Sequence, residues 1–360
     1  MKLNKAFRFR IYPNEEQKIL INKTFGCCRF IYNKMLSDKI LFYQQTKQSL
    51  KNTPAQYKQE FEFLKEVDCQ ALCYEQMNLQ SAYNNFFRDP KIGFPKFKRK
   101  KFGKRAYTTN CIFITNNKIK LGKLGVIICK FHRHIPMGHI IKSATISQKS
   151  SGKYYISILT EYSYEIPNKQ LDKNKSLGLD YSSKNFYIDN QNMKALKEHY
   201  YRQSENKLAR EQRKLSLMKY GSNNYFKQKA KLGKVYELIE NQRKDFIERK
   251  STELARSYDY ICIEDINMKN MSQTLRLGKS TMDNGFGMFR VRLQQKMELL
   301  GKKLIKIDKW FPSSKTCRFC GCINKNLKLK DREWDCECGA HLLRDENAAI
   351  NILKEGLKLV

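Results

Sequence analysis

Two short stretches near the end of the printed sequence do most to decide its fold: TCRFCG (316–321) and DCECG (335–339). Each stretch presents two cysteines close together, and about fifteen residues separate the two pairs. The four cysteines are Cys317, Cys320, Cys336 and Cys338. Zinc binds four thiolates at the corners of a tetrahedron, and the glycine that ends each stretch permits the tight turn this geometry needs. The spacing therefore predicts a zinc ribbon that holds one zinc ion.

The ligand set of this ribbon stays open in one respect. The second pair is CxC rather than CxxC, and Cys322 and His341 lie close enough in the sequence to replace one of the four ligands. Free cysteines in a reduced protein are the alternative interpretation. However, twelve cysteines in 360 residues are too few for a disulfide scaffold, and in a reducing compartment a close cluster is typical of a metal site. Four protein ligands leave zinc no open position, so we expect a structural site.

Three carboxylates stand at the ends of predicted secondary-structure elements. YICIE (260–264) is a near-continuous apolar run, typical of a strand buried on both faces, and it ends in Glu264. Asp180 follows the short apolar strand SLGL (176–179), and Asp345 begins a helix with an apolar face. Taken singly, an acid at such a position is more often an exposed residue at a strand end or a helix N-terminus.

Together, the three acids fit one chemistry. In open α/β sheets, ligands bind outside the carboxyl ends of the strands. Hydrolysis of a phosphodiester needs a nucleophilic water and charge neutralisation at the leaving oxygen, and two divalent ions held by carboxylate oxygens provide both. If the carboxylates converge, the pattern predicts a nuclease site that holds two magnesium ions at Asp180, Glu264 and Asp345.

A basic segment without any acidic residue spans residues 91–105. Its cations are Lys91, Lys96, Lys98, Arg99, Lys100, Lys101, Lys104 and Arg105. A charge run of this kind is often only a solvated loop. Here Phe94, Phe97 and Phe102 interleave with the cations. Aromatic rings that stack on bases beside phosphate contacts are typical of nucleic-acid binding, so we expect this segment to bind nucleic acid.

The rest of the first half alternates between strand and helix patterns. Residues 5–12 (KAFRFRIY) alternate apolar and polar side chains and predict a strand. Apolar residues recur at helical spacing over 15–45 and 54–87, which predicts a helical lobe. Short alternating segments between 111 and 166 predict a small β-barrel or sheet. Since the N-terminal strand has no nearby partner of its own, we expect it to join that sheet and the helical lobe to be an insertion.

The second half begins after a polar linker at 167–175, the clearest domain boundary in the sequence. Residues 176–189 predict a hairpin of two strands. Two basic stretches, 199–219 and 225–257, predict a pair of antiparallel helices with a break at 220–222.

The net charge of the chain indicates which kind of molecule it binds. The 70 Lys and Arg against 35 Asp and Glu give a formal net charge of +35, which makes a large polyanion the expected partner. A basic membrane-surface protein is the rival interpretation, but no apolar run approaches the roughly 18 residues of a membrane span. A cleavable signal is also not evident, so we expect a cytoplasmic protein that does not bind membranes.

At this point the motifs resemble a known family, the TnpB (OrfB) proteins of bacterial insertion sequences, relatives of the type V CRISPR effectors. The resemblance runs nearly end to end. Its motifs are FRFRIYPNEEQ (7–17), GFPKFKRKK (93–101), GLDYSSKNFYID (178–189), YDYICIEDINMKNM (258–271), KWFPSSKTCRFCG (309–321) and RDENAAINIL (344–353). One departure stands at Leu343, where many members have an acid. That position is not one of the three metal acids, so we expect activity to survive.

The resemblance implies an α+β or α/β multidomain fold. It combines a wedge-type β-barrel, into which a helical recognition lobe is inserted, with an RNase H-like (RuvC) nuclease core, into which the zinc ribbon is inserted. The expected domains are a wedge-type β domain (1–12 and 106–167), the helical recognition lobe with the basic segment (13–105), the RuvC-like domain (176–314 and 341–360) and the zinc ribbon that binds target nucleic acid (315–340).

The same resemblance implies the function and assigns the catalytic and magnesium-binding role to Asp180, Glu264 and Asp345. Members of the family use a guide RNA from the transposon end, recognise a short transposon-adjacent motif in double-stranded DNA and cut where the guide pairs. We expect a magnesium-dependent, RNA-guided DNA endonuclease that is monomeric in complex with its RNA.

Two other functions compete with this expectation. Some relatives have lost their acids and act as RNA-guided repressors that bind DNA without cutting, but this chain keeps all three acids. A transposase or an accessory protein of transposition is the third interpretation. The sequence offers no candidate for a tyrosine recombinase site, because its five histidines are scattered and form no His-hydrophobe-His pair.

Overall fold

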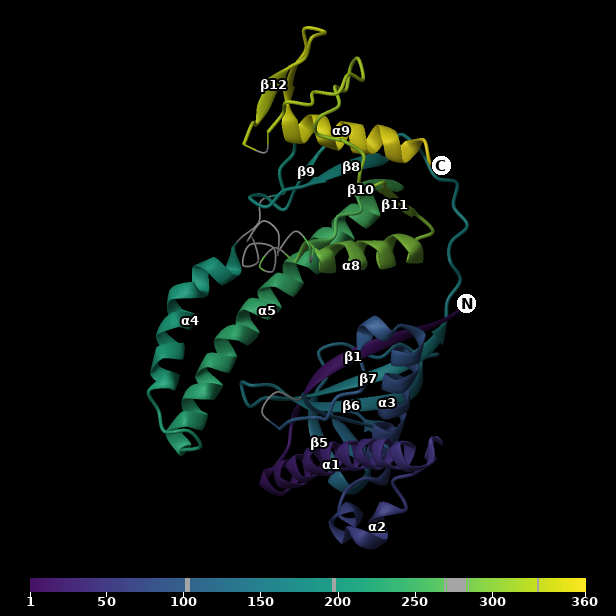
Figure 1. Cartoon of the computed structure of the whole chain (residues 1–360), viewed down its shortest axis with the longest axis vertical. Coiled ribbons are helices and arrows are strands. Elements are labelled where there is room, and N and C mark those ends of the chain that lie inside the picture. Colours follow the sequence, from purple (N-terminus) through teal and green to yellow (C-terminus); the bar gives the residue numbers. More distant parts are fainter. Residues whose placement is uncertain (101–103, 196–198, 269, 271–282, 284, 329) are drawn as a thin grey trace. The chain divides into compact units, whose positions relative to one another are not determined.

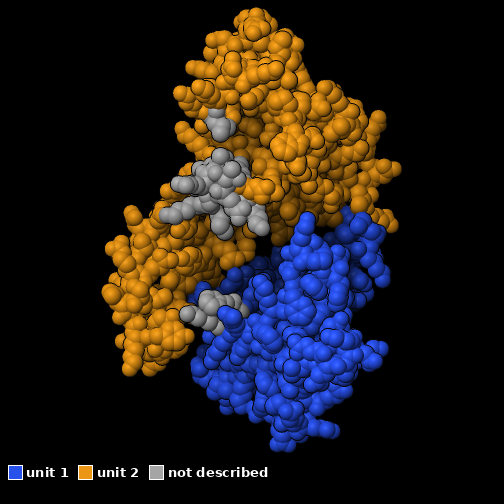
Figure 2. Space-filling model, viewed as in Figure 1, with its two compact units in different colours: residues 1–164 blue, residues 165–360 orange. Residues whose placement is uncertain are grey.

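A computed structural model describes the chain from residue 1 to residue 360, except for residues 101–103, 196–198, 269, 271–282, 284 and 329. The chain divides into two compact units, Met1–Tyr164 and Glu165–Val360, which Figure 2 distinguishes by colour. Each unit has its own sheet and its own helices, and we describe them separately.

The first unit contains a seven-stranded sheet with the order β2-β6-β7-β1-β5-β4-β3. The strands are β1 (Lys2–Tyr12), β2 (Arg105–Thr109), β3 (Ile112–Thr115), β4 (Lys118–Leu121), β5 (Gly125–Lys130), β6 (Ile140–Gln148) and β7 (Tyr154–Ser163). The N-terminal strand β1 pairs antiparallel with β7 along its length and with β5 near its end. Inward-facing Phe7, Phe9 and Ile11 of β1 are buried, because alternate residues of a strand face the core.

The helices of the first unit lie between β1 and β2 in the chain. They are α1 (Glu15–Thr46), α2 (Tyr57–Glu60) and α3 (Cys69–Arg88), with short 3₁₀ turns η1 (Glu62–Lys65) and η2 (Pro90–Ile92). Helix α1 begins with a capping box, in which Asn14 and Gln17 each bond the other's backbone N–H through a side-chain oxygen. The second helical stretch expected from the sequence is broken into α2, η1 and α3.

The sheet of the first unit is open, so the predicted closed β-barrel is wrong. Among the described residues, β2 and β3 form the two edges and do not pair with each other. Only Asn110 and Cys111 join these strands, so the edges come near one another and the sheet curls strongly. At this corner Asp68, the N-cap of α3, accepts a hydrogen bond from Thr109 at 2.6 Å. The N-terminus of α3 therefore contacts the end of β2. Closing the barrel would have required hydrogen bonds between β2 and β3 that begin at this point.

The second unit contains a four-stranded sheet with the order β11-β10-β8-β9. The strands are β8 (Ser176–Tyr181), β9 (Tyr187–Asp189), β10 (Tyr260–Glu264) and β11 (Lys303–Ile307). Strands β8, β10 and β11 are parallel, and β9 pairs antiparallel with β8 as a hairpin. The carboxyl ends of the three parallel strands therefore lie at one edge of the sheet.

Helices cover both faces of this sheet (Figure 1). One face, with Leu177, Leu179, Ile261 and Ile263, packs against α5 (Asn223–Ser257) and α8 (Phe286–Leu299). The opposite face, with Tyr260, Cys262 and Ile307, packs against α9 (Arg344–Leu357). Helix α9 comes so close that a Cβ at Gly356 would lie 2.3 Å from the Cys262 sulfur. The apolar run at 260–263 is thus buried on both faces, as the sequence predicted.

Two more features complete the second unit. Helix α4 (Tyr200–Ser216) and α5 run antiparallel as a long hairpin whose turn lies far from the sheet of this unit in Figure 1, which confirms the predicted helix pair. The strands β12 (Glu333–Asp335) and β13 (His341–Leu343) form a small hairpin, and this hairpin extends beyond residue 340, the predicted end of the ribbon. Within the described part of the chain, the helices lack either the length or the apolar character to cross a membrane.

Candidate zinc and catalytic sites

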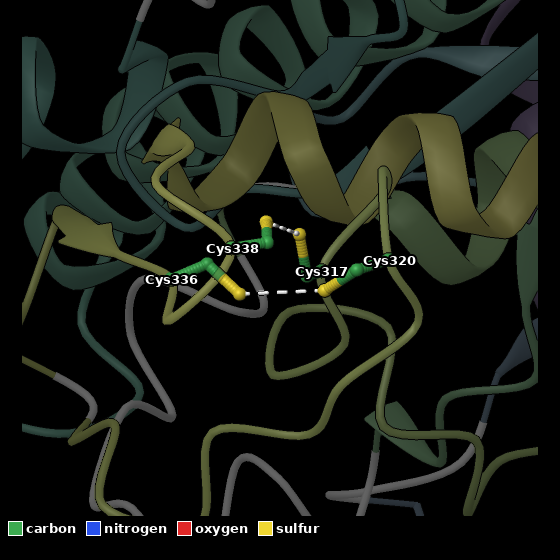
Figure 3. A group of neighbouring side chains, drawn as sticks. All are labelled: Cys317, Cys320, Cys336 and Cys338. Atoms are coloured by element: carbon green, nitrogen blue, oxygen red, sulfur yellow. Dashed lines mark hydrogen bonds between the residues drawn. The ribbon is translucent and has the colours of Figure 1, made fainter.

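The four cysteines of the two knuckles meet in space. Figure 3 shows Cys317 next to Cys338 and Cys320 next to Cys336, with Sγ–Sγ distances of 3.8 and 3.5 Å. All four Sγ atoms lie within 4.8 Å of one another. Tetrahedral zinc with Zn–S bonds of 2.3 Å requires sulfurs about 3.8 Å apart, so these donors fit a zinc ion. The cluster suggests a zinc site with four protein ligands.

The two residues that could have replaced a ligand lie outside this group. The group within 4.8 Å contains neither His341 nor Cys322. Instead, His341 bonds Asp335 through Nδ1 at 2.7 Å, and its Nε2 lies 3.5 Å from a Glu333 oxygen. The hydrogen bond with Asp335 and the nearby negative charges raise the pKa of His341. A hydrogen bond from the Cys322 backbone is the largest of the effects that lower the pKa of Cys320 to about 6, which favours the thiolate that binds zinc.

The three predicted catalytic acids share one face of the second sheet. Ile263 pairs with Leu179 across the parallel strands β10 and β8, so the next residues, Glu264 and Asp180, follow side by side at the carboxyl ends. Alternation along the strands places both on the face that α9 covers. Asp345 lies in the first turn of α9. The fold thus brings residues from three separate stretches of sequence to one sheet edge.

Asp180 shows the electrostatic effect of this arrangement most clearly. Its surroundings are mostly protein, although part of its surface remains open to solvent. Burial, together with the negative charges of Glu264 and Asp345, raises the pKa of Asp180 well above its ordinary value. The positive charge of Arg344 and the Tyr181 backbone N–H act in the opposite direction and do not cancel the effect.

Glu264 is held by a hydroxyl and by a neighbouring cation. Burial raises its pKa, and a hydrogen bond donated by the Ser313 hydroxyl partly offsets that shift. Arg290 donates to the backbone carbonyl of Glu264 at 3.3 Å and lies 3.5 Å from the carboxylate of Asp265. The cation therefore pairs with the exposed Asp265 and leaves the side chain of Glu264 to Ser313.

Asp345 is partly exposed and lies 3.7 Å from Arg332 of the ribbon. In the described residues, the oxygens of the three acids do not form a group as tight as the 4.8 Å cysteine cluster. Nevertheless, the negative charges of Glu264 and Asp345 oppose the ionisation of Asp180, and a divalent cation bound beside Asp180 would relieve this repulsion. Their hard oxygen donors suit magnesium.

Sequence reasoning missed two buried asparagines that connect α9 to the ribbon. Asn351 donates to the carbonyls of Ser313 at 2.8 Å and Thr316 at 2.6 Å. Asn347 donates to Thr316 at 2.7 Å and accepts the backbone N–H of Arg318 at 3.0 Å. Their spacing of four residues on an apolar helix face was the available signal, because buried amides require partners.

The basic segment is partly engaged within the first unit. Lys98 forms an ion pair with the buried Glu75, and Phe94 packs against Tyr83 and Phe86 of α3. A cavity of about 650 Å³ is lined by Lys98, Arg99, Lys100, Lys104 and Arg105 together with residues of α1, α3 and β2. The remaining cations of the segment lie elsewhere: Lys91 and Lys96 are exposed, and Lys101, like Phe102, is outside the described residues.

Three family models match the chain. Two of them are OrfB models of IS605: a helix-turn-helix domain, which matches residues 1–48, and a probable transposase, which matches residues 158–275. The third is a Cas12f1-like TNB domain, which matches residues 286–352. In this structure, the residues matched by the first model form the strand β1 and the single helix α1.

Relatives match nearly the whole chain. A Streptomyces pristinaespiralis protein, provisionally named an RNA-guided DNA endonuclease, is 31% identical over 99% of this chain and 90% of its own length. The Escherichia coli K12 protein InsQ, with the same provisional name, is 28% identical over 99% of this chain and 93% of its own length. A cryo-EM structure of Cas12f1 with single guide RNA and target DNA aligns with a TM-score of 0.57 at 12% identity, covering 98% of this chain and 99% of that one. The chain therefore belongs to the TnpB (OrfB) family and has a Cas12f-like fold of mixed helices and strands.

Proposed function

We propose that the protein is a transposon-encoded, RNA-guided endonuclease that cuts double-stranded DNA next to a short transposon-adjacent motif. The observation that carries this proposal is the convergence of Asp180, Glu264 and Asp345, with the raised pKa of Asp180. The names of the relatives and the RNA and DNA in the Cas12f1 complex support the same function.

The acids define the chemistry that the site can perform. Two magnesium ions, when bound by the three carboxylates, would supply an activated water and neutralise the leaving oxygen. In this proposal, Ser313 fixes one oxygen of Glu264 and leaves the other free to bind metal. Asn351 holds the Ser313 backbone from α9, the helix that carries Asp345, so two of the acids are positioned by one hydrogen-bonded segment. The four cysteines would hold a single structural zinc.

The second sheet supports a RuvC-like, RNase H-like assignment for the core. Two of its three parallel strands, β8 and β10, carry an acid at their carboxyl end, α9 supplies the third acid, and helices cover both faces. We assign residues 176–314 and 341–360 to that core and 315–340 to the zinc ribbon. Residues 13–105 are the proposed recognition lobe, and residues 1–12 and 106–167 are the wedge-type domain. We propose that the basic segment at 91–105 binds nucleic acid, and that the protein acts as a monomer with a guide RNA from the transposon end.

One experiment tests the whole proposal. The protein is purified from cells that also carry its transposon end, and the RNA that accompanies it is sequenced. A discrete RNA is expected, and DNA that matches its variable end should be cut in magnesium. Changing the guide should redirect the cut. If protein free of RNA cuts the same target equally well, RNA guidance is wrong. Matched binding without cutting would favour a repressor.

A further inference from the structure

The turn between α4 and α5 presents an exposed group of aromatic rings. Tyr220 and Tyr225 have ring centroids 5.1 Å apart, and Tyr225 and Phe226 have centroids 5.7 Å apart. Tyr220 is 74% exposed, Phe226 is 53% exposed and the neighbouring Leu217 is 87% exposed. We call Leu217, Tyr220, Tyr225 and Phe226 the aromatic tip. Its exposure is unusual, because large apolar side chains gathered at one exposed point normally mark an interaction site.

The surroundings of the aromatic tip restrict its partner to a polyanion. Between Glu211 and Glu237 the chain has no acidic residue. The exposed cations nearest the turn are Arg213, Lys214, Lys219, Lys227, Lys229 and Lys231. Among the described residues, none of these six takes part in an ion pair. An apolar protein contact does not need these cations. An anionic lipid surface would attract them, but only nucleic acid offers both flat bases for the rings and phosphates for the cations.

Hydrogen bonds between α4 and α5 fix the helical hairpin that carries the aromatic tip. Close to the turn, the buried Gln228 of α5 donates to both the backbone and the side chain of Glu211 on α4, at 3.1 and 2.7 Å. Farther along, Gln212 donates to the hydroxyl of Tyr236 at 2.6 Å. Ser222 caps α5 by accepting the Tyr225 backbone N–H, which fixes the start of the second helix. Little ordering entropy remains to be lost when a ligand stacks on rings that are already placed.

We propose that the aromatic tip stacks on unpaired bases of bound RNA while the cations around it bind the phosphates on either side. The argument for unpaired bases is geometric: the faces of paired bases are covered by their neighbours in the helix, and aromatic side chains reach base faces in loops, bulges and ends. This inference rests on the proposal that the chain carries RNA, but it assigns a contact that the nuclease site does not require.

The test uses full-length protein freed of nucleic acid by a high-salt wash and an unstructured A/C-repeat RNA as the probe. The double variant Tyr220→Ala/Phe226→Ala should lose at least about fivefold in affinity without any change in the dependence on salt. Lys219→Gln/Lys227→Gln should instead reduce the log-log salt slope by about 1.4, which is about 0.7 for each lost phosphate contact. Annealing the probe to its complement should shrink the effect of the aromatic variant.

Phe113→Ala is the matched control, because Phe113 of β3 is 67% exposed and lies outside the aromatic tip, the basic segment and the proposed recognition lobe. It should leave RNA affinity unchanged.

A second readout is photo-crosslinking of a 4-thiouridine-substituted probe, which should label the peptide that contains residues 215–227. Equal affinity of wild type and aromatic variant, with no such crosslink, would refute the aromatic tip and leave the nuclease proposal intact. Wild type that binds no RNA would refute both. Self-association that the aromatic variant abolishes, without loss of RNA affinity, would assign the tip to a protein contact.

Discussion

Gly178 of β8 and Ala349 of α9 touch through their backbones. A Cβ at Gly178 would lie 2.1 Å from the carbonyl oxygen of Ala349 and 2.8 Å from the Leu353 Cβ, which leaves no room for any side chain. Gly178 stands two residues before Asp180, and Ala349 stands one helical turn after Asp345. This backbone contact therefore sets the distance between strand and helix at the point where the acids of both elements meet.

Gly178→Ala should destabilise the second unit and reduce DNA cutting. The added methyl meets a backbone atom that cannot move aside without shifting α9, and overpacking of this kind costs about 1–3 kcal/mol. Urea unfolding and a cutting assay measure the two effects. Gly287→Ala in α8 is the control, because its Cβ would make only an ordinary contact of 3.7 Å with Met268. It should be neutral or stabilising. Equal effects of both substitutions would show that close packing at Gly178 is not the cause.

Asp180→Asn, Glu264→Gln and Asp345→Asn should each abolish cutting while guide RNA and target DNA remain bound. The reason is that each amide keeps the shape of the side chain but loses the charge that binds metal. The control is Asp265→Asn, since Asp265 is exposed and pairs with Arg290 at 3.5 Å. Cleavage and gel-shift assays on one target separate the two effects. Cutting that survives all three changes, or that stops only in the Asp265 variant, would overturn the assignment.

In the absence of divalent cations, Asp180→Asn should stabilise the protein at neutral pH. The raised pKa of Asp180 means that the folded state binds its proton more tightly than the unfolded state does, so the stability of the wild type falls as pH rises above the ordinary Asp pKa of 3.8. The variant should melt higher at neutral pH, by about 2–4 °C for each kcal/mol recovered, and the gap should close in acid. Magnesium should raise the melting temperature of the wild type only. An unchanged melting curve would contradict the inferred repulsion.

Ser313→Ala should move the acidic limb of the pH profile of cutting to higher pH. The Ser313 hydroxyl lowers the pKa of Glu264, so its removal lets the pKa rise and keeps the carboxyl protonated over a wider range. Protonated Glu264 binds magnesium poorly, and more magnesium should restore cutting. Ser314→Ala provides the neighbouring control. A uniform loss at every pH would indicate a structural role for Ser313 instead.

Cys317→Ser or Cys336→Ser should release zinc and unfold the ribbon, because structural zinc contributes on the order of 10 kcal/mol to the folding of small modules. Cys322→Ser should retain a full complement of zinc, since Cys322 lies outside the group of four sulfurs. Elemental analysis of the purified proteins decides between them. Loss of zinc from the Cys322 variant alone would change the ligand set.

The parts of the molecule that could be predicted from the sequence are those with a local signal. Each pair of cysteines, the apolar run that ends in Glu264, and the break between α4 and α5 can each be recognised within a few consecutive residues. The open edge between β2 and β3 could not be predicted in this way, because strand pairing at a sheet edge depends on contacts far apart in the chain. For the same reason, the hydrogen bond from Asn351 to the Ser313 carbonyl could not be predicted from the sequence, because it joins residues 38 positions apart.

Helix α9 also determines at which stage of protein synthesis the three-acid site can form. It follows every other described element of the second unit in chain order, and it carries Asp345 and covers one whole face of the sheet. Until the ribosome has released these residues, Tyr260, Cys262 and Ile307 have no cover on that face, and Asp180 and Glu264 have no third acid. A nascent or prematurely terminated chain therefore cannot cut DNA, even when its RNA-binding surfaces are already folded. The site is therefore complete only once α9 has been translated and has packed on the sheet.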